Sequence, residues 1–182
     1  MLLKMLGEHE HRSILPGELM CAVAVNPPID LEGSGRRLAL PGNRIYDQHF
    51  VKLLVEDVAR RVQRHADAPR PLYAAAPRTL REFDDLYTAP VSGFQGVTDY
   101  YERCSAEQFV PSIMTPTLIL TASDDPLVPS ESSERLACPS SVTVHITSGG
   151  GHLGYLSRRG RDADCRWMDW RVVEWLTAHL RP

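Results

Sequence analysis

The hydrophobic residues of this chain follow two kinds of pattern. Continuous apolar or β-branched runs at 20–25, 117–121 and 142–146 are typical of buried strands in a parallel sheet. Apolar residues at helical spacing predict helices at about 46–64 and 168–180. Because strands alternate with helices toward the carboxyl end, the pattern favours βαβ units and an α/β fold with a parallel sheet.

Shorter elements complete this pattern. Short helices are expected at residues 1–6, from the capping pattern that begins at Thr79, at 99–104 and at 131–137. The glycine- and proline-containing segments 33–43 and 87–97 are expected to be loops. The block from about 30 to 110 holds no convincing strand. We therefore interpret it as a helical insertion over the sheet rather than as a second domain.

Two strands are followed by residues that can carry acid–base chemistry. Asp124 and Asp125 come directly after one strand, and His152 follows the next within the glycine-rich sequence GGGHLGYL. If the strands are parallel neighbours, these side chains meet at one edge of the sheet, where open α/β sheets bind ligands. A carboxylate that fixes one imidazole nitrogen leaves the other free to accept a proton from a nucleophile. The alternative is an ordinary turn and an ordinary loop histidine.

Composition and charge narrow the function classes. The formal net charge of −3 gives no basic field for nucleic acid or an anionic membrane. The four scattered cysteines form no C-x-x-C pair, which argues against a zinc site and fits reduced thiols in the cytoplasm. No apolar run is long enough for a membrane span. His9 and His11 form an H-x-H pair, but without an evident third ligand a polar turn is the favoured interpretation.

Several longer motifs resemble one enzyme family. The sequence LILTASDDPLVP matches the G-x-x-D-x-x-V-P layout of the acid loop in α/β-hydrolases, and GGGHLGYL resembles their histidine loop. A more specific resemblance is to the YheT-type, embryogenesis-associated branch of that superfamily. It covers nearly the whole chain and rests on MLLKMLGE, NPPIDL, NRIY, TLREFDDLYTAPVSGF, DYYERCS and the tryptophan-rich end.

The resemblance implies a function and assigns roles to residues. It makes Asp125, not Asp124, the catalytic acid and His152 the catalytic base of a carboxylic ester hydrolase. The substrates implied are acyl esters, and no cofactor or metal is required. The fold implied is the carboxyl-terminal part of an α/β-hydrolase parallel sheet, with residues 1–182 as one partial domain and a helical cap insertion at about 30–110.

One part of the family's machinery is missing from the sequence. The serine nucleophile should lie in a G-x-S-x-G elbow, but no serine of the chain has glycine two residues before and two after it. In the family, the elbow directly precedes a helix resembling MLLKMLGE. We therefore expect that the chain starts just after the elbow, that it is inactive alone, and that strand 20–25 leaves an open edge for self-association. The alternative is a non-catalytic, degenerate hydrolase fragment that binds a partner.

Overall fold

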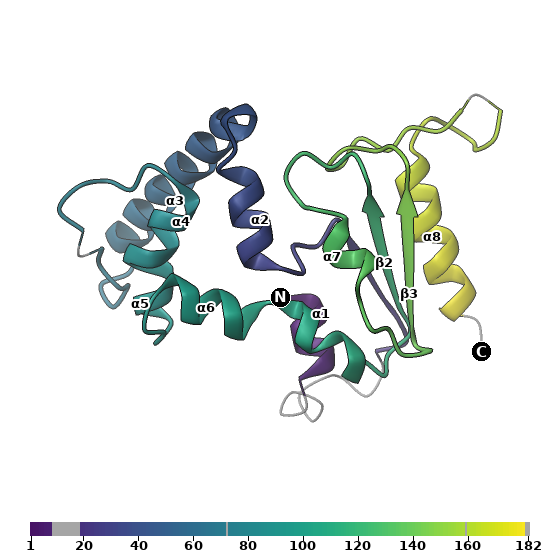
Figure 1. The fold of residues 1–182 in the computed structure, drawn as a ribbon, viewed down its shortest axis with the longest axis horizontal. Coiled ribbons are helices and arrows are strands. Elements are labelled where there is room, and N and C mark those ends of the chain that lie inside the picture. The colour runs from purple at the N-terminus through teal and green to yellow at the C-terminus, as the bar shows by residue number, and fades with distance from the viewer. Residues whose placement is uncertain (9–18, 72, 159, 181–182) are drawn as a thin grey trace. The chain divides into compact units, whose positions relative to one another are not determined.

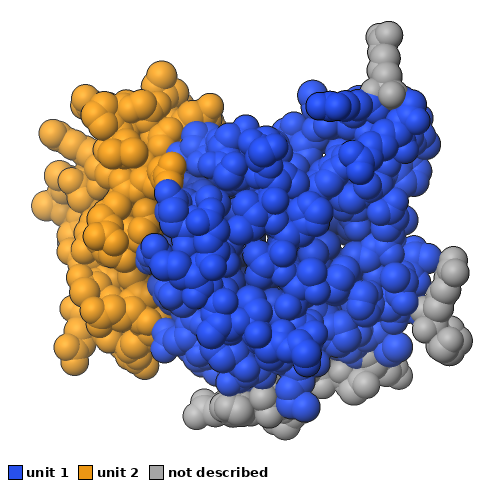
Figure 2. All heavy atoms as spheres, turned by 45° about the vertical axis from the view of Figure 1, so that its right-hand side comes forward, with its two compact units in different colours: residues 1–30, 105–182 blue, residues 31–104 orange. Residues whose placement is uncertain are grey.

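The computed structural model describes residues 1–8, 19–71, 73–158 and 160–180. The chain divides into two compact units, coloured separately in Figure 2. Unit 1 comprises Met1–Asp30 and Ser105–Pro182, and unit 2 comprises Leu31–Cys104. The chain therefore leaves unit 1 once, forms unit 2, and returns.

Unit 1 is built on a parallel sheet of three strands in the order β1-β2-β3 (Figure 1). The strands are β1 (Ala22–Val25), β2 (Thr117–Ala122) and β3 (Val142–Thr147), which confirms the three predicted strands. All six residues of the central strand β2 are buried. The register pairs Val25 with Leu120, and Leu120 with His145, so the carboxyl ends of the strands lie at the same edge. The α/β class with a parallel sheet is confirmed.

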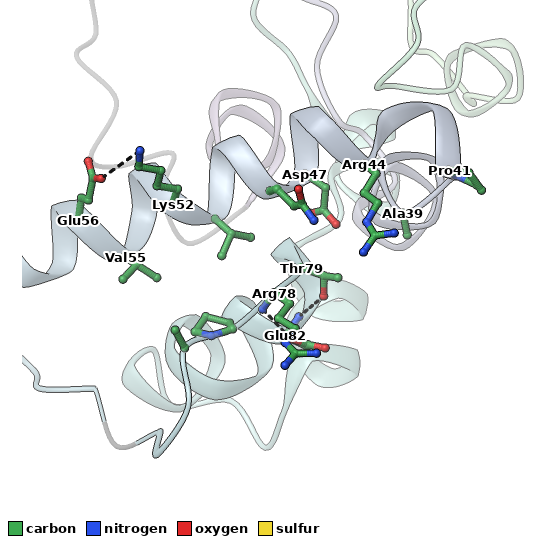
Figure 3. A pocket seen from close by; sticks show the side chains of 14 residues that line it. Ala39, Pro41, Arg44, Asp47, Lys52, Val55, Glu56, Arg78, Thr79 and Glu82 are labelled. Atoms are coloured by element: carbon green, nitrogen blue, oxygen red, sulfur yellow. Dashed lines mark hydrogen bonds and ion pairs between the residues drawn. The ribbon is translucent and has the colours of Figure 1, made fainter.

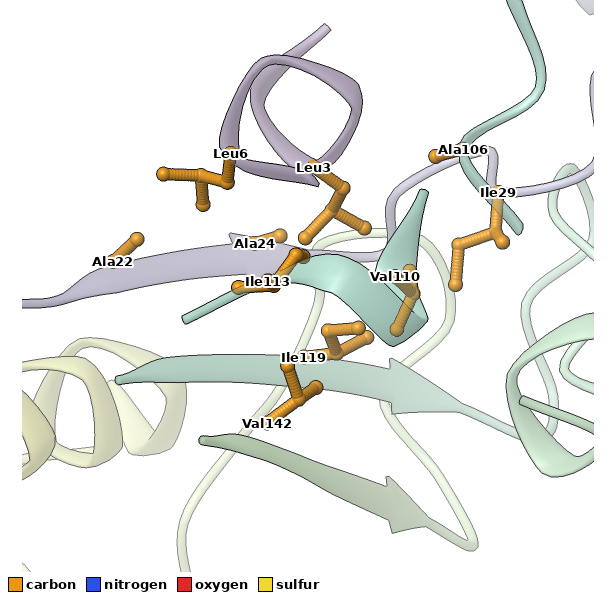
Figure 4. Close-up of a cluster of buried hydrophobic side chains, with 10 residues drawn as sticks. All are labelled: Leu3, Leu6, Ala22, Ala24, Ile29, Ala106, Val110, Ile113, Ile119 and Val142. Atoms are coloured by element: carbon orange, nitrogen blue, oxygen red, sulfur yellow. The ribbon is translucent and has the colours of Figure 1, made fainter. Parts of the chain in front are cut away.

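Helices cover both faces of this sheet. On one face, α1 (Leu2–Gly7) and the 3₁₀ turn η5 (Val110–Ser112) pack on alternate strand residues, and Figure 4 shows Leu3 and Leu6 directed at the strands. This cluster contains Leu3, Leu6, Ala22, Ala24, Ile29, Ala106, Val110, Ile113, Ile119 and Val142. The opposite face carries Leu120, Ala122 and Tyr155, with Trp167 and Met168 of α8 (Trp167–Leu180) packed against them. Burial of each leucine or isoleucine side chain stabilises the folded state by about 1.5–3 kcal/mol.

Two parts of unit 1 are exposed in the described residues: the apolar face of helix α8 and one edge of strand β1. No residue of α8 is fully buried, and Val173 and Leu180 on its predicted apolar face are 50% and 58% exposed. Within the described residues, β1 pairs only with β2, so its other edge carries no strand. The short helix α7 (Glu131–Glu134) and the 3₁₀ turn η4 (Ala106–Gln108) complete the described helical elements of this unit.

Among the described residues of unit 2, every regular element is a helix or helical turn and none is a strand, as expected for the block without a strand pattern. Its elements are α2 (Leu31–Leu38), the 3₁₀ turn η2 (Pro41–Asn43), α3 (Arg44–Arg64), α4 (Leu80–Phe83), the π-helical turn η3 (Asp84–Thr88), α5 (Ala89–Val91) and α6 (Val97–Cys104). A small core of Val58, Phe83 and Tyr87 joins α3 to the α4–η3 segment. The hydroxyl of Thr79 accepts from the backbone N–H of Glu82 at 3.2 Å, which confirms the predicted capping of α4.

The expected loop at 33–43 is wrong over its first half, which is the carboxyl-terminal part of helix α2. Gly33 and Gly35 suggested a loop, but Gly35 lies against the ring of Tyr101 on α6, and an added Cβ would be 3.4 Å from that ring. Glycine here permits close packing of two helices. Glu32 in the first turn and Arg36 and Arg37 in the last turn also suit the helix dipole.

The expected loop at 87–97 is wrong over its first part, where η3 and α5 continue from α4. Pro90 lies at the beginning of α5, directly after the π-helical turn η3. The carboxylate of Asp85 reaches across the remaining loop and accepts from the N–H of Val97 at 2.9 Å, at the start of α6. Contacts across the unit, rather than local propensity, therefore define these turns.

Candidate active site

The acid loop begins where β2 ends. Asp125 lies three residues beyond Ala122, the last residue of β2, and is almost completely buried, at 2% exposure. Its Oδ1 accepts hydrogen bonds from the backbone N–H groups of Leu127 at 2.8 Å and Val128 at 3.1 Å. An aspartate that bonds the backbone two and three residues onward stabilises a tight turn. The turn therefore holds one carboxylate oxygen and leaves the other for a second partner.

That second partner is His152. Its Nδ1 lies 2.9 Å from Oδ2 of Asp125, although the two residues are 27 positions apart in the sequence. The side chain of His152 is 37% exposed and that of Asp125 is 0% exposed. The carboxylate is thus shielded from water while the imidazole remains reachable. Hydrogen bonding of Nδ1–H to a buried carboxylate leaves Nε2 as the basic nitrogen.

The three glycines before His152 have distinct backbone requirements. Gly150 has φ +148° and Gly151 has φ +53°, which L side chains rarely adopt. An added Cβ on Gly150 would lie 2.4 Å from the ring of Tyr155. The glycine run therefore lets the backbone turn closely over Tyr155 and direct His152 toward Asp125.

The neighbouring carboxylates Asp124 and Asp125 have different positions. Oδ1 of Asp124 accepts from the backbone N–H of Gly151 at 2.8 Å, so Asp124 bonds the histidine loop and not the imidazole. Of the two candidates, the structure brings only Asp125 to His152.

Sequence reasoning missed two residues of this edge, Asn26 and Tyr155. Asn26 follows β1, and its side chain bonds both the histidine loop and β2. The hydroxyl of Tyr155 donates to Oδ1 of Asn26 at 2.8 Å, and its ring stacks on Trp167 with centroids 5.8 Å apart. Burial raises the pKa of Tyr155. The available signal was position: Asn26 ends a predicted strand, at the same edge as the acid and histidine loops.

The cavities of the two units differ in size and chemistry. A cavity of about 360 Å³ lies beside the histidine loop, lined by Thr147, Ser148, Gly149, Gly150, Gly154, Tyr155, Leu156 and Trp167. A larger one, of about 810 Å³, lies in unit 2 between α3 and the segment that leads into α4 (Figure 3). Polar groups there stabilise the unit: Asp47 accepts from the N–H of Leu80 at 2.7 Å, and Glu82 accepts from that of Arg78 at 2.7 Å. Burial, with the nearby charge of Glu82 adding to it, raises the pKa of Asp47.

The described residues also bear on metal binding, disulfide bonding and membrane crossing. Within the described residues, no group of three or more histidine, cysteine or acidic side chains is placed to hold a metal ion. His9 and His11 lie outside those residues. The cysteines Cys21, Cys104, Cys138 and Cys165 form no disulfide. No described helix combines the length and the apolar character that a membrane crossing requires.

Three serines have a neighbouring glycine in the sequence, but none of them lies in a nucleophile elbow. Ser34 is in α2, and Ser92 follows α5, both in unit 2. Ser148 lies just after β3 and lines the smaller cavity. None of these three stands at a turn from a strand into a helix, which is where a nucleophile elbow is built.

Comparison with known proteins finds relatives of this chain, although no protein-family model matches it. The YheT protein of Escherichia coli is 32% identical over 163 residues, which are 87% of this chain and 47% of that protein. A Saccharomyces cerevisiae monoacylglycerol lipase is 30% identical over 162 residues, 85% of this chain and 35% of the lipase. The embryogenesis-associated protein EMB8 of Picea glauca is 33% identical over 104 residues, 56% of this chain and 23% of that protein. A monoacylglycerol lipase structure from Paleococcus ferrophilus matches with a TM-score of 0.45 and 19% identity, covering 93% of this chain and 63% of the lipase chain.

The parallel sheet and the three curated relatives identify the class of this protein as the α/β-hydrolase superfamily. Within that superfamily, the chain belongs to the YheT-type branch that includes EMB8. The chain spans about half the length of YheT and less of the other two curated relatives.

Proposed function

We propose that this chain supplies the acid and the base of a serine-type carboxylic ester hydrolase, with Asp125 as acid and His152 as base. The observation that carries the proposal is the 2.9 Å contact between Nδ1 of His152 and Oδ2 of Asp125. The carboxylate is buried, and its other oxygen is held by two backbone N–H groups. These features hold the imidazole in one orientation and one tautomer. Two relatives, YheT and a yeast monoacylglycerol lipase, support an ester substrate.

The chemistry follows from the free nitrogen of His152. With the proton on Nδ1, Nε2 accepts the proton of a serine hydroxyl as its oxygen attacks the ester carbonyl. The buried charge of Asp125 stabilises the imidazolium that forms. The imidazolium then protonates the leaving alcohol, and the same nitrogen activates the water that releases the acid. The proposal requires no metal or cofactor, and the substrate class is an acyl ester.

The nucleophile in this proposal is supplied by residues outside the 182 of the chain, since no serine within them lies in a G-x-S-x-G sequence. The chain alone is accordingly expected to be inactive by this mechanism, because the nucleophile is the group that attacks the ester. Unit 2 corresponds to the helical cap insertion that the family resemblance implies. The edge of β1 that carries no strand among the described residues makes the isolated chain self-associate. The absence of a disulfide among the four cysteines supports a cytoplasmic location.

The experiment begins with the native protein from its source cells. Its intact mass and amino-terminal sequence are measured, and it is treated with a fluorophosphonate probe that labels activated serines. We expect a product longer than 182 residues, labelled at a serine in a G-x-S-x-G sequence just before MLLKMLGE. His152→Ala is expected to abolish labelling and hydrolysis of p-nitrophenyl esters. His49→Ala, which removes an exposed histidine of unit 2, is the matched control and is expected to change neither.

The alternative function is a non-catalytic hydrolase fragment that binds a partner, and the missing elbow favours it. A native product that begins at Met1 and takes no label would establish this alternative and overturn the proposal. Labelling that survives in His152→Ala would also overturn it, since the base would then lie elsewhere.

A further inference from the structure

Asn26 has an unusual backbone for its position. It follows the last residue of β1 with φ +41°, and no other described non-glycine residue has a positive φ. Asparagine tolerates this conformation better than most residues. Its own N–H donates to the carbonyl of Leu120 at 2.7 Å, and its exposed fraction is only 2%. The left-handed turn therefore places a polar side chain in the interior at the carboxyl edge of the sheet.

The amide of Asn26 uses all of its hydrogen-bonding capacity. Nδ2 donates to the carbonyl of Gly151 at 3.2 Å and to the carbonyl of His152. Oδ1 accepts from the N–H of Ala122 at 3.0 Å and from the hydroxyl of Tyr155 at 2.8 Å. An amide offers two donors and two acceptor sites, and all four are occupied. The orientation of the amide is unambiguous, because a flipped amide would direct its oxygen at two carbonyls.

These four bonds join the backbones that carry the acid and the base. Ala122 begins the turn that holds Asp125, whose N–H returns to the carbonyl of Ala122 at 3.3 Å. The two carbonyls bonded by Nδ2 belong to His152 and the residue before it. A displacement of the amide would therefore shift one backbone against the other and lengthen the contact between Nδ1 and Oδ2. Asp124 makes a second connection between the acid loop and the histidine loop, by accepting a hydrogen bond from the exposed N–H of Gly151.

We propose that Asn26 is the positioning residue that sets the geometry of the Asp125–His152 pair, an inference that rests on the function proposed above. Asn26 touches neither the imidazole nor the carboxylate. It acts on the orientation of both through the main chain. Removal of Asn26 should therefore lower the rate of the chemical step and allow the imidazole of His152 more than one orientation. Substrate binding should stay largely unchanged.

The test uses Asn26→Asp, which tolerates the same backbone and keeps both acceptor contacts but places an oxygen against the two carbonyls. In the native protein we expect kcat for p-nitrophenyl esters to fall about 100-fold, as for a displacement of about 1 Å in an active site, with KM changed less than about threefold. Asn26→Gly keeps the backbone conformation and removes the side chain, and we expect a similar fall. Thr117→Val is the matched control: it removes the buried hydroxyl that bonds the carbonyl of Thr115, at the opposite end of β2. It should lower stability without changing kcat.

A second readout does not depend on hydrolysis. Nitrogen-15 NMR of the histidine rings in the native protein reports which nitrogen of His152 carries the proton. We expect a single Nδ1-protonated state in the unmodified chain and in Thr117→Val, and a mixture of both tautomers in Asn26→Asp. If the native protein hydrolyses no ester, the proposed function fails, and this spectrum still decides the role of Asn26.

Unchanged kcat and an unchanged His152 spectrum in a folded Asn26→Asp would overturn the inference. If that variant does not fold, Tyr155→Phe replaces it, since it removes one bond to the amide and keeps the stacked ring. We expect a fall in kcat of about threefold to tenfold, because one of the four bonds to the amide is lost, and partial loss of the single tautomer. A spectrum identical to that of the unmodified chain would overturn the inference for this variant too.

Discussion

A buried aspartate in each unit shows how differently the two regions use the same group. Asp125 in unit 1 and Asp47 in unit 2 are 2% and 5% exposed, and each accepts backbone N–H at the start of a turn or helix. Asp125 presents its second oxygen to an imidazole, whereas the charge of the Glu82 carboxylate adds to burial in raising the pKa of Asp47. Asp47 lines the larger cavity, whereas neither Asp125 nor His152 lines the larger or the smaller one. Cavity size alone is therefore a poor guide to the chemistry of this chain.

The largest expected effect is on catalysis by Asp125→Ala. Loss of the carboxylate leaves His152 without the group that fixes its tautomer, and we expect kcat of the native protein to fall about 10³- to 10⁴-fold, equivalent to about 4–5.5 kcal/mol. Asp47→Ala should leave kcat within about threefold, because it acts on the stability of unit 2. Steady-state kinetics with p-nitrophenyl esters checks both. Equal losses in the two variants would remove the distinction between the regions.

The glycines give the next contrast, which is in stability. Gly150→Ala would force a methyl group into the ring of Tyr155 at a positive φ, and we expect a loss of about 3 kcal/mol in the free energy of unfolding. Gly151→Ala meets no atom within 4 Å but also has a positive φ, so its loss should be about 1 kcal/mol.

Gly42→Ala in unit 2 is the matched control for these two variants. It meets no atom within 4 Å and needs no positive φ, so we expect a change within about 0.5 kcal/mol. Urea unfolding of the three variants gives the order. If Gly150→Ala were as stable as Gly42→Ala, the close turn over Tyr155 would be wrong.

A smaller effect on stability is expected for Asp47→Ala itself. The N–H of Leu80 would lose its acceptor inside unit 2, which costs about 1–3 kcal/mol. Asp47→Asn keeps an acceptor oxygen and relieves the burial of a charge, so it should retain most of the stability. Thermal unfolding of both variants tests this. A larger loss in Asp47→Asn than in Asp47→Ala would contradict the hydrogen-bonding role.

The smallest predicted effect is a pH dependence from Asp84. Burial raises the pKa of Asp84 above its ordinary value of 3.8, while hydrogen bonds from Thr88 and Tyr101 partly oppose the shift. Between 3.8 and the raised pKa, the folded chain keeps a proton that the unfolded chain has released. The contribution of Asp84 to the free energy of unfolding therefore falls as pH rises through that window.

Asp84→Asn cannot titrate and should lack this contribution. Melting temperatures of the variant and the unmodified chain, measured from about pH 3.5 to 7, should diverge in favour of the variant as the pH rises. A difference that stays constant with pH would show that Asp84 titrates alike in the folded and unfolded chains.

Local patterns in the sequence account for much of the fold. The apolar run of β2 and the helical spacing of α3 were visible because strand and helix periodicity depend on near neighbours. The errors have a common cause. α2 forms despite its two glycines because Gly35 packs on Tyr101, 66 positions further along the chain. Residues 87–91 are helical because they continue a turn that begins at α4.

The candidate site divides in the same way. The sequence by itself determined that Asp125 and His152 each follow a strand, and it predicted one shared edge if those strands are parallel neighbours. The family resemblance named Asp125 as the acid. Only the tertiary structure showed that the strands are neighbours, that Asp125 meets the imidazole, why Gly150 must be glycine, and what Asn26 bonds. The contacts of the Asp125–His152 pair and of the Asn26 side chain join residues 27 to 129 positions apart. A local pattern holds no information about such distances, since they arise when the chain brings the ends of β1, β2 and β3 together.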